Sequence, residues 1–208
     1  MAEVALGLYL FYLLTAFGLR TVLQYRRTGS TGFLGLGGRP GSAEWCGGVS
    51  FALALLLGLS APVLQLLGGV APLPMLDTPA GRGAGLVLAV AGIAGTLTAQ
   101  QGMGTSWRIG VDREETTALV TGSMFALVRN PVFTAMLTAG LGLTLLAPNL
   151  VAATGLLALV AAIEIQVRAV EEPYLLRTHG TDYRGYASRT GRFLPSVGRL
   201  RGRSHNIK

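Results

Sequence analysis

Four charged residues near the end of a long apolar segment have the spacing of neighbours on one helical face. Arg168 follows Glu164 by four positions and precedes Glu171 and Glu172 by three and four. Residues three and four apart are adjacent on a helix, so the simplest interpretation is a salt-bridge cluster that ends a helix at a membrane surface. The alternative is a site, because carboxylates can accept a proton or hold a cationic ligand. Pro173 comes next and is expected to break or kink the chain, so that Glu171 and Glu172 stand where the regular helix stops.

A second group, Arg129-Asn130-Pro131, directly precedes an apolar stretch. Asn favours the cap position of a helix and Pro its first turn, so we expect a helix to begin here. The free amides and positive dipole end of a helix start favour an anion, and Arg129 adds a bidentate donor. With Glu171 and Glu172 opposite, the pattern suits a zwitterionic amino-acid group, its carboxylate at the helix start and its ammonium at the glutamates.

The composition indicates which elements must position these groups. Of the 208 residues 50% are hydrophobic and 13% charged, with a mean hydropathy of +0.52, which is typical of a membrane protein rather than a soluble domain. A spanning helix needs about 20 apolar residues. Such stretches lie near residues 4–25, 49–70 and 83–104. The Gly-rich segment 28–48 between the first two is expected to be a surface loop.

The apolar stretch 131–163 contains no charged residue and is too long for one span. Pro148-Asn149 divides it, which predicts a tight hairpin of two helices, about 131–147 and 149–168. We therefore predict an all-α polytopic membrane protein with five transmembrane helices, followed by a cytoplasmic C-terminal segment. Helices 1–3 occupy residues 1–104, the catalytic region 105–195 and a basic tail 196–208. The hairpin brings the polar segments 100–131 and 164–195 to one membrane edge.

The distribution of basic residues predicts the orientation. Lys and Arg follow the first and third helices and the hairpin, whereas the loop between helices two and three holds only Arg82. Basic loops are retained in the cytoplasm, so the N-terminus is expected outside and the C-terminus inside, in the cell inner membrane. The net charge of +7 then indicates contact with anionic lipids rather than nucleic acid. One cysteine and two histidines support neither an internal disulfide nor a metal site, and no obligate protein partner is evident.

The residue order resembles one family of membrane enzymes. "TALVTGSMFALVRNPVF", an apolar hairpin and "EEPYLLRTHGTDYRGYASRTGRFLP" are similar to the isoprenylcysteine carboxyl methyltransferase-like family, whose relatives include phospholipid N-methyltransferases. The resemblance covers about residues 100–195. The matching positions are Leu119, Val120, Gly122, Phe125, Arg129, Pro131, Glu171, Glu172, Leu175, Gly180, Tyr183, Tyr186 and Pro195.

The resemblance implies S-adenosylmethionine (SAM) bound on the cytoplasmic side and methyl transfer to a lipophilic, membrane-embedded substrate with a carboxyl, amine or hydroxyl acceptor. Arg168 would orient the substrate. Where the acceptor must lose a proton, the nearest carboxylates that could accept it are those of Glu164, Glu171 and Glu172. The implied cofactor-binding residues are Thr117, Ala118, Leu119, Val120, Phe125, Arg129, Asn130, Pro131, Val132, Phe133, Glu171 and Glu172.

Two positions depart from the family pattern. Asn130 replaces the usual His and Phe133 replaces the usual Tyr, so prenylcysteine is not assigned as the substrate. Asn can still donate hydrogen bonds and Phe can still stack on a ring or face a cation. Two alternatives stay open: an NADPH-dependent membrane reductase of the sterol reductase type, and a non-enzymatic membrane protein that retains the fold.

Overall fold

The computed structural model describes residues 1–31, 37–104 and 118–200, and these ranges form a bundle of long helices. In chain order the helices are α1 (Ala2–Leu13), α2 (Arg20–Thr28), α3 (Ala43–Leu66), α4 (Pro79–Gly102), α5 (Pro131–Leu146), α6 (Leu150–Ile165) and α7 (Glu172–Arg189). The π-helical segment Leu14–Leu19 joins α1 to α2, a second one, Gln166–Glu171, joins α6 to α7, and a short 3-10 helix spans Ser123–Ala126. The described part is helical, as predicted.

Four continuous helical segments are long and apolar enough to cross a membrane. They are Ala2–Thr28, Ala43–Leu66, Pro79–Gly102 and Leu150–Arg189, while the apolar α5 is shorter. At 1.5 Å per residue, the 16 residues of α5 extend about 24 Å, less than the hydrocarbon thickness of about 30 Å. The integral membrane character is thus supported by four helices, and the count of five spans stays a prediction.

Three helix boundaries differ from expectation because local caps and turns were not recognised. Ser42 accepts a hydrogen bond from the Trp45 amide and starts α3 inside the segment expected to be a loop. Thr78 likewise accepts from the Gly81 amide and starts α4 earlier. Before Pro173, which was expected to break or kink the chain, the regular α-helix does stop, at Ile165. The chain is not broken, however, and continues through the π-helical segment into α7 with Pro173 in its first turn. The first turn needs no amide hydrogen there.

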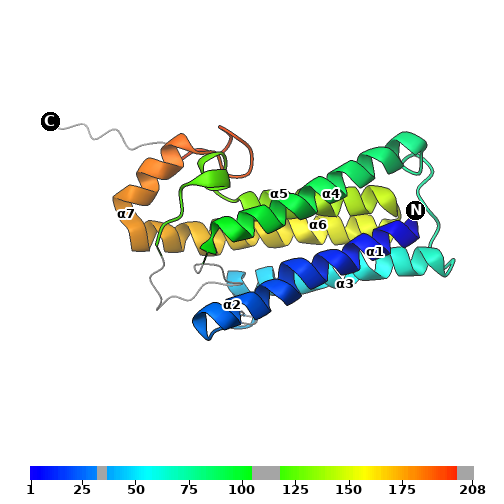
Figure 1. Cartoon of the computed structure of the whole chain (residues 1–208), viewed down its shortest axis with the longest axis horizontal. Coiled ribbons are helices and arrows are strands. Elements are labelled where there is room, and N and C mark those ends of the chain that lie inside the picture. The colour runs from blue at the N-terminus through cyan, green and yellow to red at the C-terminus, as the bar shows by residue number, and fades with distance from the viewer. Residues whose placement is uncertain (32–36, 105–117, 201–208) are drawn as a thin grey trace.

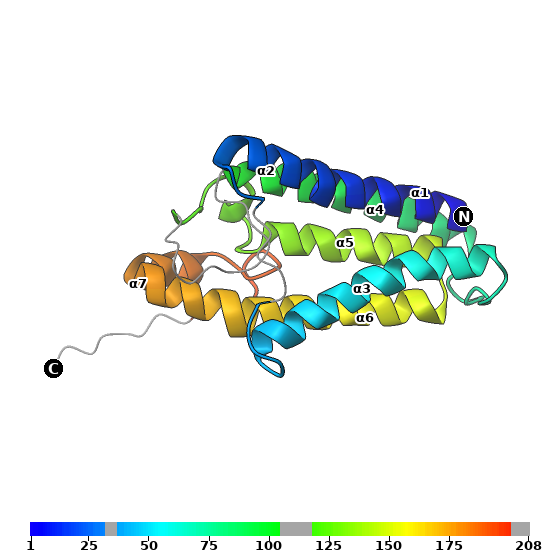
Figure 2. The same ribbon diagram turned by 90° about the horizontal axis from the view of Figure 1, so that it is seen from below.

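The five long helices run side by side, and α7 extends beyond one end of the bundle (Figure 1). Turned by 90°, α1 and α4 lie on one side, α3 and α6 on the other, with α5 between them (Figure 2). The expected hairpin of α5 and α6 is present, yet its arms pack mainly elsewhere, α5 against α4 and α6 against α3. Small residues allow this close approach in membranes.

The α4–α5 contact depends on glycines. A methyl group added to Gly92 would overlap the backbone of Ala139, and one added to Gly142 would overlap that of Ala89. At the turn, Asn149 is fully buried; its Oδ1 accepts from the Ala152 amide, which caps α6. Its Nδ2 also donates to the carbonyl of Ala61 on α3 at 3.1 Å. These contacts fix the hairpin and so set where the start of α5 meets α7.

Candidate active site

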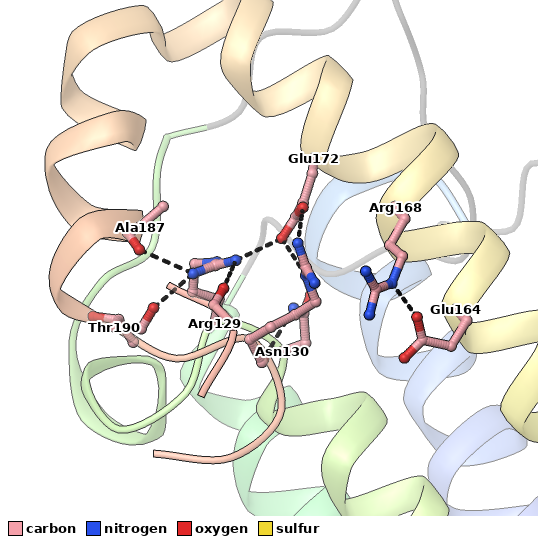
Figure 3. A network of polar contacts seen from close by, with 9 residues as sticks. Arg129, Asn130, Glu164, Arg168, Glu172, Ala187 and Thr190 are labelled. Carbon is pink, nitrogen blue, oxygen red and sulfur yellow. Dashed lines mark hydrogen bonds and ion pairs between the residues drawn. The ribbon is translucent and has the colours of Figure 1, made fainter. Parts of the chain in front are cut away.

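Arg129 is the centre of a buried polar network at the end of the bundle from which α7 extends. Its side chain is 1% exposed and lies just before α5. Nη1 donates to the carbonyl oxygens of Ala187 at 3.0 Å and Thr190 at 2.6 Å. Nη2 donates to Glu172 Oε1 at 2.7 Å and to the Gly198 carbonyl at 3.1 Å. Figure 3 shows the Arg129 side chain between Glu172 and the end of α7, so this residue joins two segments distant in sequence.

Glu172 is held by two arginines. Besides Arg129, Arg192 donates to it from both Nε, 2.8 Å from Oε1, and Nη2, 2.8 Å from Oε2. This two-point geometry is the strong form of an arginine–carboxylate pair. The hydrogen bonds with Glu172 raise the pKa of Arg192 above its ordinary value, so Arg192 stays charged at any workable pH. Two cations and one anion leave the trio with a net positive charge.

Residues 190–198, here called the C-terminal strap, run along the start of α5. The amide of Arg129 donates to the Gly191 carbonyl at 2.8 Å, and Thr134 Oγ1 donates to the Phe193 carbonyl at 2.9 Å. Within the strap the Arg192 amide donates to the Val197 carbonyl at 2.7 Å, which closes a compact turn. The strap therefore brings its own side chains to the end of α5.

Asn130 stands where a helix cap was predicted but does not act as one. Its amide and its Nδ2 both donate to the Arg192 carbonyl at 3.1 Å, and its side chain makes no capping hydrogen bond to α5. The predicted side-chain cap is wrong because the strap supplies a better-placed acceptor. Pro131 does occupy the first turn of α5, as expected. The first amides of α5 are thus left without a side-chain cap.

Glu164 and Arg168 form a separate pair. The side chain of Arg168 is 57% exposed and that of Glu164 is 38% exposed. Figure 3 shows this pair beside the Arg129–Glu172 pair, with no contact drawn between the two pairs. The expectation that all four charged residues form one cluster is wrong, because the π-helical segment Gln166–Glu171 changes the rotation along the helix. Glu171 instead accepts a hydrogen bond from Gln166 Nε2 at 3.4 Å.

The other predicted cofactor-binding residues lie around this network, and their role stays a prediction. Thr117 is outside the described residues; Ala118 is exposed, whereas Leu119 and Val120 are partly buried. Leu119 packs beside Tyr183 and Tyr186.

Phe125 is buried, and its carbonyl accepts a hydrogen bond from the Tyr186 hydroxyl at 2.5 Å. Val132 and Phe133 are partly buried and pack against the bundle core. Pro131 is fully buried.

Two polar groups were missed from the sequence. Arg192 was counted among the basic residues of the cytoplasmic side, although its position three residues before the family-type Pro195 was a usable signal. The second group includes Arg20, which is 6% exposed and donates from Nη2 to the carbonyls of Gln100 at 3.2 Å and Gly104 at 2.7 Å. Gln100 Nε2 donates to the Ala16 carbonyl at 3.0 Å. These contacts join α2 and the π-helical segment Leu14–Leu19 to the end of α4 and to Gly104 just after it.

The apolar helices indicate an integral membrane protein, and the buried polar network lies at one end of its bundle. The profile of the phospholipid methyltransferase family matches residues 81–182, which include Arg129, Glu164, Arg168 and Glu172. The matched region belongs to this family of membrane methyltransferases. Comparison with curated proteins and with solved structures gave no match.

Proposed function

We propose that the protein is a SAM-dependent methyltransferase that acts on a lipophilic substrate at the cytoplasmic membrane surface. The observation that carries the proposal is the Arg129–Glu172 pair, which lies within the region matched by the family and joins the start of α5 to α7. The site also has features that suit a zwitterionic cofactor. The start of α5 has no side-chain cap, the trio has a net positive charge, and Arg129 Nε is buried without a hydrogen-bond partner among the described residues.

When bound, SAM would supply an activated methyl group on a sulfonium. The residues proposed to hold it are those at positions 117–120, Phe125, 129–133 and 171–172. The chain's contribution is then to hold both reactants in line and to exclude water. Phe133, partly buried on the first turn of α5, offers a ring face for the cationic sulfonium or the adenine.

Glu164 and Arg168 are the groups proposed to meet the substrate. Their exposure leaves them accessible, whereas both oxygens of Glu172 already accept hydrogen bonds from arginines. An ionised carboxylate acceptor would need no base and would pair with Arg168. An amine or hydroxyl acceptor would pass its proton to Glu164. We therefore assign Glu172 a positioning role and Glu164 the proton transfer.

An apolar cavity between α1, α3, α5 and α6 offers contacts for part of a lipophilic substrate. It has a volume of about 70 Å³, and its lining includes Phe17, Gly58, Met136 and Leu159. The hydroxyl of Tyr9, which also lines it, donates to the Leu55 carbonyl at 2.6 Å. Met136 lies about one turn along α5 from Phe133, so the apolar space begins close to the proposed site.

Calorimetric titration of the detergent-purified protein with SAM and with NADPH tests the proposal. We expect saturable SAM binding and transfer of labelled methyl groups from SAM into a lipid extract. Glu164→Gln should lose transfer for a substrate that must be deprotonated but keep SAM binding. Asp77→Asn, which removes the carboxylate that pairs with Arg82 at 2.9 Å outside the site, is the matched control. Saturable NADPH binding without SAM binding would favour the reductase, and no binding of either by folded protein would favour a non-enzymatic role.

The proposed orientation, with the N-terminus outside, is tested by cysteine labelling. In a Cys46→Ser background, Asp77→Cys lies in the loop between α3 and α4, and Val197→Cys lies in the exposed part of the strap. An impermeant maleimide should label position 77 in intact cells and position 197 only after permeabilisation. Labelling of both positions from the same side would overturn the orientation.

A further inference from the structure

The two arginines that bind Glu172 differ in their exposure and in the hydrogen-bond donors that they leave unused. All four Nη hydrogen-bond contacts of Arg129 go to Glu172 and to backbone carbonyls, and its side chain is 1% exposed. Arg192 is 14% exposed and uses only Nε and Nη2 on Glu172. Its Nη1 makes no hydrogen bond to the residues that the structure describes. Arg129 also has an unpaired donor, Nε, but its side chain is almost fully buried. The unused donor on the more exposed side chain is therefore Nη1 of Arg192.

The position of Arg192 is fixed beside the start of α5. Its carbonyl accepts two hydrogen bonds from Asn130, one from the amide and one from Nδ2, both at 3.1 Å. The carbonyl of the following residue, Phe193, accepts a hydrogen bond from Thr134 Oγ1 on the first turn of α5 at 2.9 Å. Arg192 is thus held at the positive end of this helix dipole, where an anion is favoured.

The other charges around Arg192 do not cancel its spare charge. Glu172 is shared with Arg129, and Glu164, which acts on Arg192 electrostatically, is paired with Arg168. The trio therefore carries one uncompensated positive charge. Arg192 also has an unused hydrogen-bond donor, Nη1, on its planar guanidinium. A carboxylate or a phosphate has the matching chemistry.

We propose that Arg192 binds the carboxylate of the methionine part of SAM, and that Arg129 is a positioning residue that acts through Glu172. This inference rests on the proposed function and transfers to Arg192 the anion-binding role that the sequence suggested for Arg129. The strap then belongs to the cofactor site, although the family match ends at residue 182.

The test compares SAM with decarboxylated SAM, which lacks only the carboxylate. Affinities for the detergent-purified protein are measured by calorimetry without lipid substrate, so that an anionic group of a lipid cannot contribute. Loss of a charge-assisted hydrogen bond corresponds to about 10- to 100-fold in affinity. We expect Arg192→Gln to weaken SAM binding by about that factor and to leave decarboxylated SAM binding nearly unchanged. Arg192→Lys, which keeps the charge but not the fork, should recover part of the loss.

The matched control is Arg189→Gln, which removes an exposed arginine at the end of α7 and should change neither affinity. If Arg192→Gln lowers the affinities for SAM and for decarboxylated SAM equally, or changes neither affinity, the inference is overturned. SAM binding by the wild type would still uphold the proposed function in that case. If Arg192→Gln does not fold, the SAM to decarboxylated SAM affinity ratio of Arg192→Lys decides, and a ratio equal to that of the wild type would overturn the inference. Absence of SAM binding by the wild type would instead reject the proposed function itself.

Discussion

Replacing Glu172 by Gln removes the only carboxylate bonded to two buried or partly buried arginines of the site, among the residues described. Removing one partner of a buried ion pair costs about 3–5 kcal/mol, because the remaining charge is left uncompensated. Arg129 would keep its carbonyl acceptors at Ala187, Thr190 and Gly198, and Gln would keep one oxygen. We therefore expect a loss at the low end of this range: Glu172→Gln should lower the free energy of unfolding by about 3 kcal/mol.

Equilibrium unfolding in mixed micelles with a rising fraction of SDS measures this change, and thermal unfolding provides a second readout. For a chain of this size each kcal/mol corresponds to about 2–4 °C, so the melting temperature should fall by about 6–12 °C. Glu164→Gln is the matched control. It removes a carboxylate of the same helical region whose ion pair with Arg168 is exposed to solvent, and exposed pairs contribute little to stability.

The control should change the free energy of unfolding much less than Glu172→Gln. Arg192→Gln should also cost less than Glu172→Gln, since Glu172 would still pair with Arg129. Equal losses in Glu172→Gln and Glu164→Gln, or a loss below about 1 kcal/mol in Glu172→Gln, would refute the view that the Glu172 carboxylate holds the network together.

Two further substitutions test the packing that positions the site. Gly92→Ala places a methyl group against the backbone of Ala139 and should destabilise the bundle by about 1–3 kcal/mol. Gly83→Ala, on the same helix with open space around it, should be neutral or stabilising in the same unfolding assay, and equal effects would contradict the packing argument. Asn149→Ala removes the α6 cap and a buried link to α3 and should cost about 2 kcal/mol. Asn130→Ala removes one side-chain hydrogen bond and should cost less; the reverse order would contradict the assignment of Asn149 as the cap.

The sequence predicts the helical bundle and the meeting of its two polar segments because both follow from hydropathy and from one turn. Apolar runs locate the helices, and Pro148-Asn149 locates the turn, so Arg129 and Glu172 were expected close together, as their 2.7 Å contact confirms. The family assignment came from the same local motifs and is confirmed for residues 81–182.

The remaining features depend on contacts between distant residues or on small changes in helical rotation. The π-helical segment Gln166–Glu171 separates Glu164 from Glu172, and the 3.6-residue period of a regular helix does not predict it. The role of Arg192 depends on Glu172, twenty positions earlier. The side chain of Asn130 bonds to the strap instead of its own helix, which local capping preferences cannot indicate.

The C-terminal strap has a consequence for the order of assembly. Arg129 and the carbonyls that accept from it at Ala187 and Gly198 are separated by 58 and 69 positions. Chains generally fold from the N-terminal side first during synthesis. The apolar helices can therefore insert and pack before the carbonyls that accept hydrogen bonds from the Arg129 guanidinium have been synthesised. The membrane bundle and the polar site are thus completed at different times. A nascent chain arrested before residue 187 would hold a largely formed bundle in which Arg129 lacks its carbonyl acceptors at Ala187, Thr190 and Gly198.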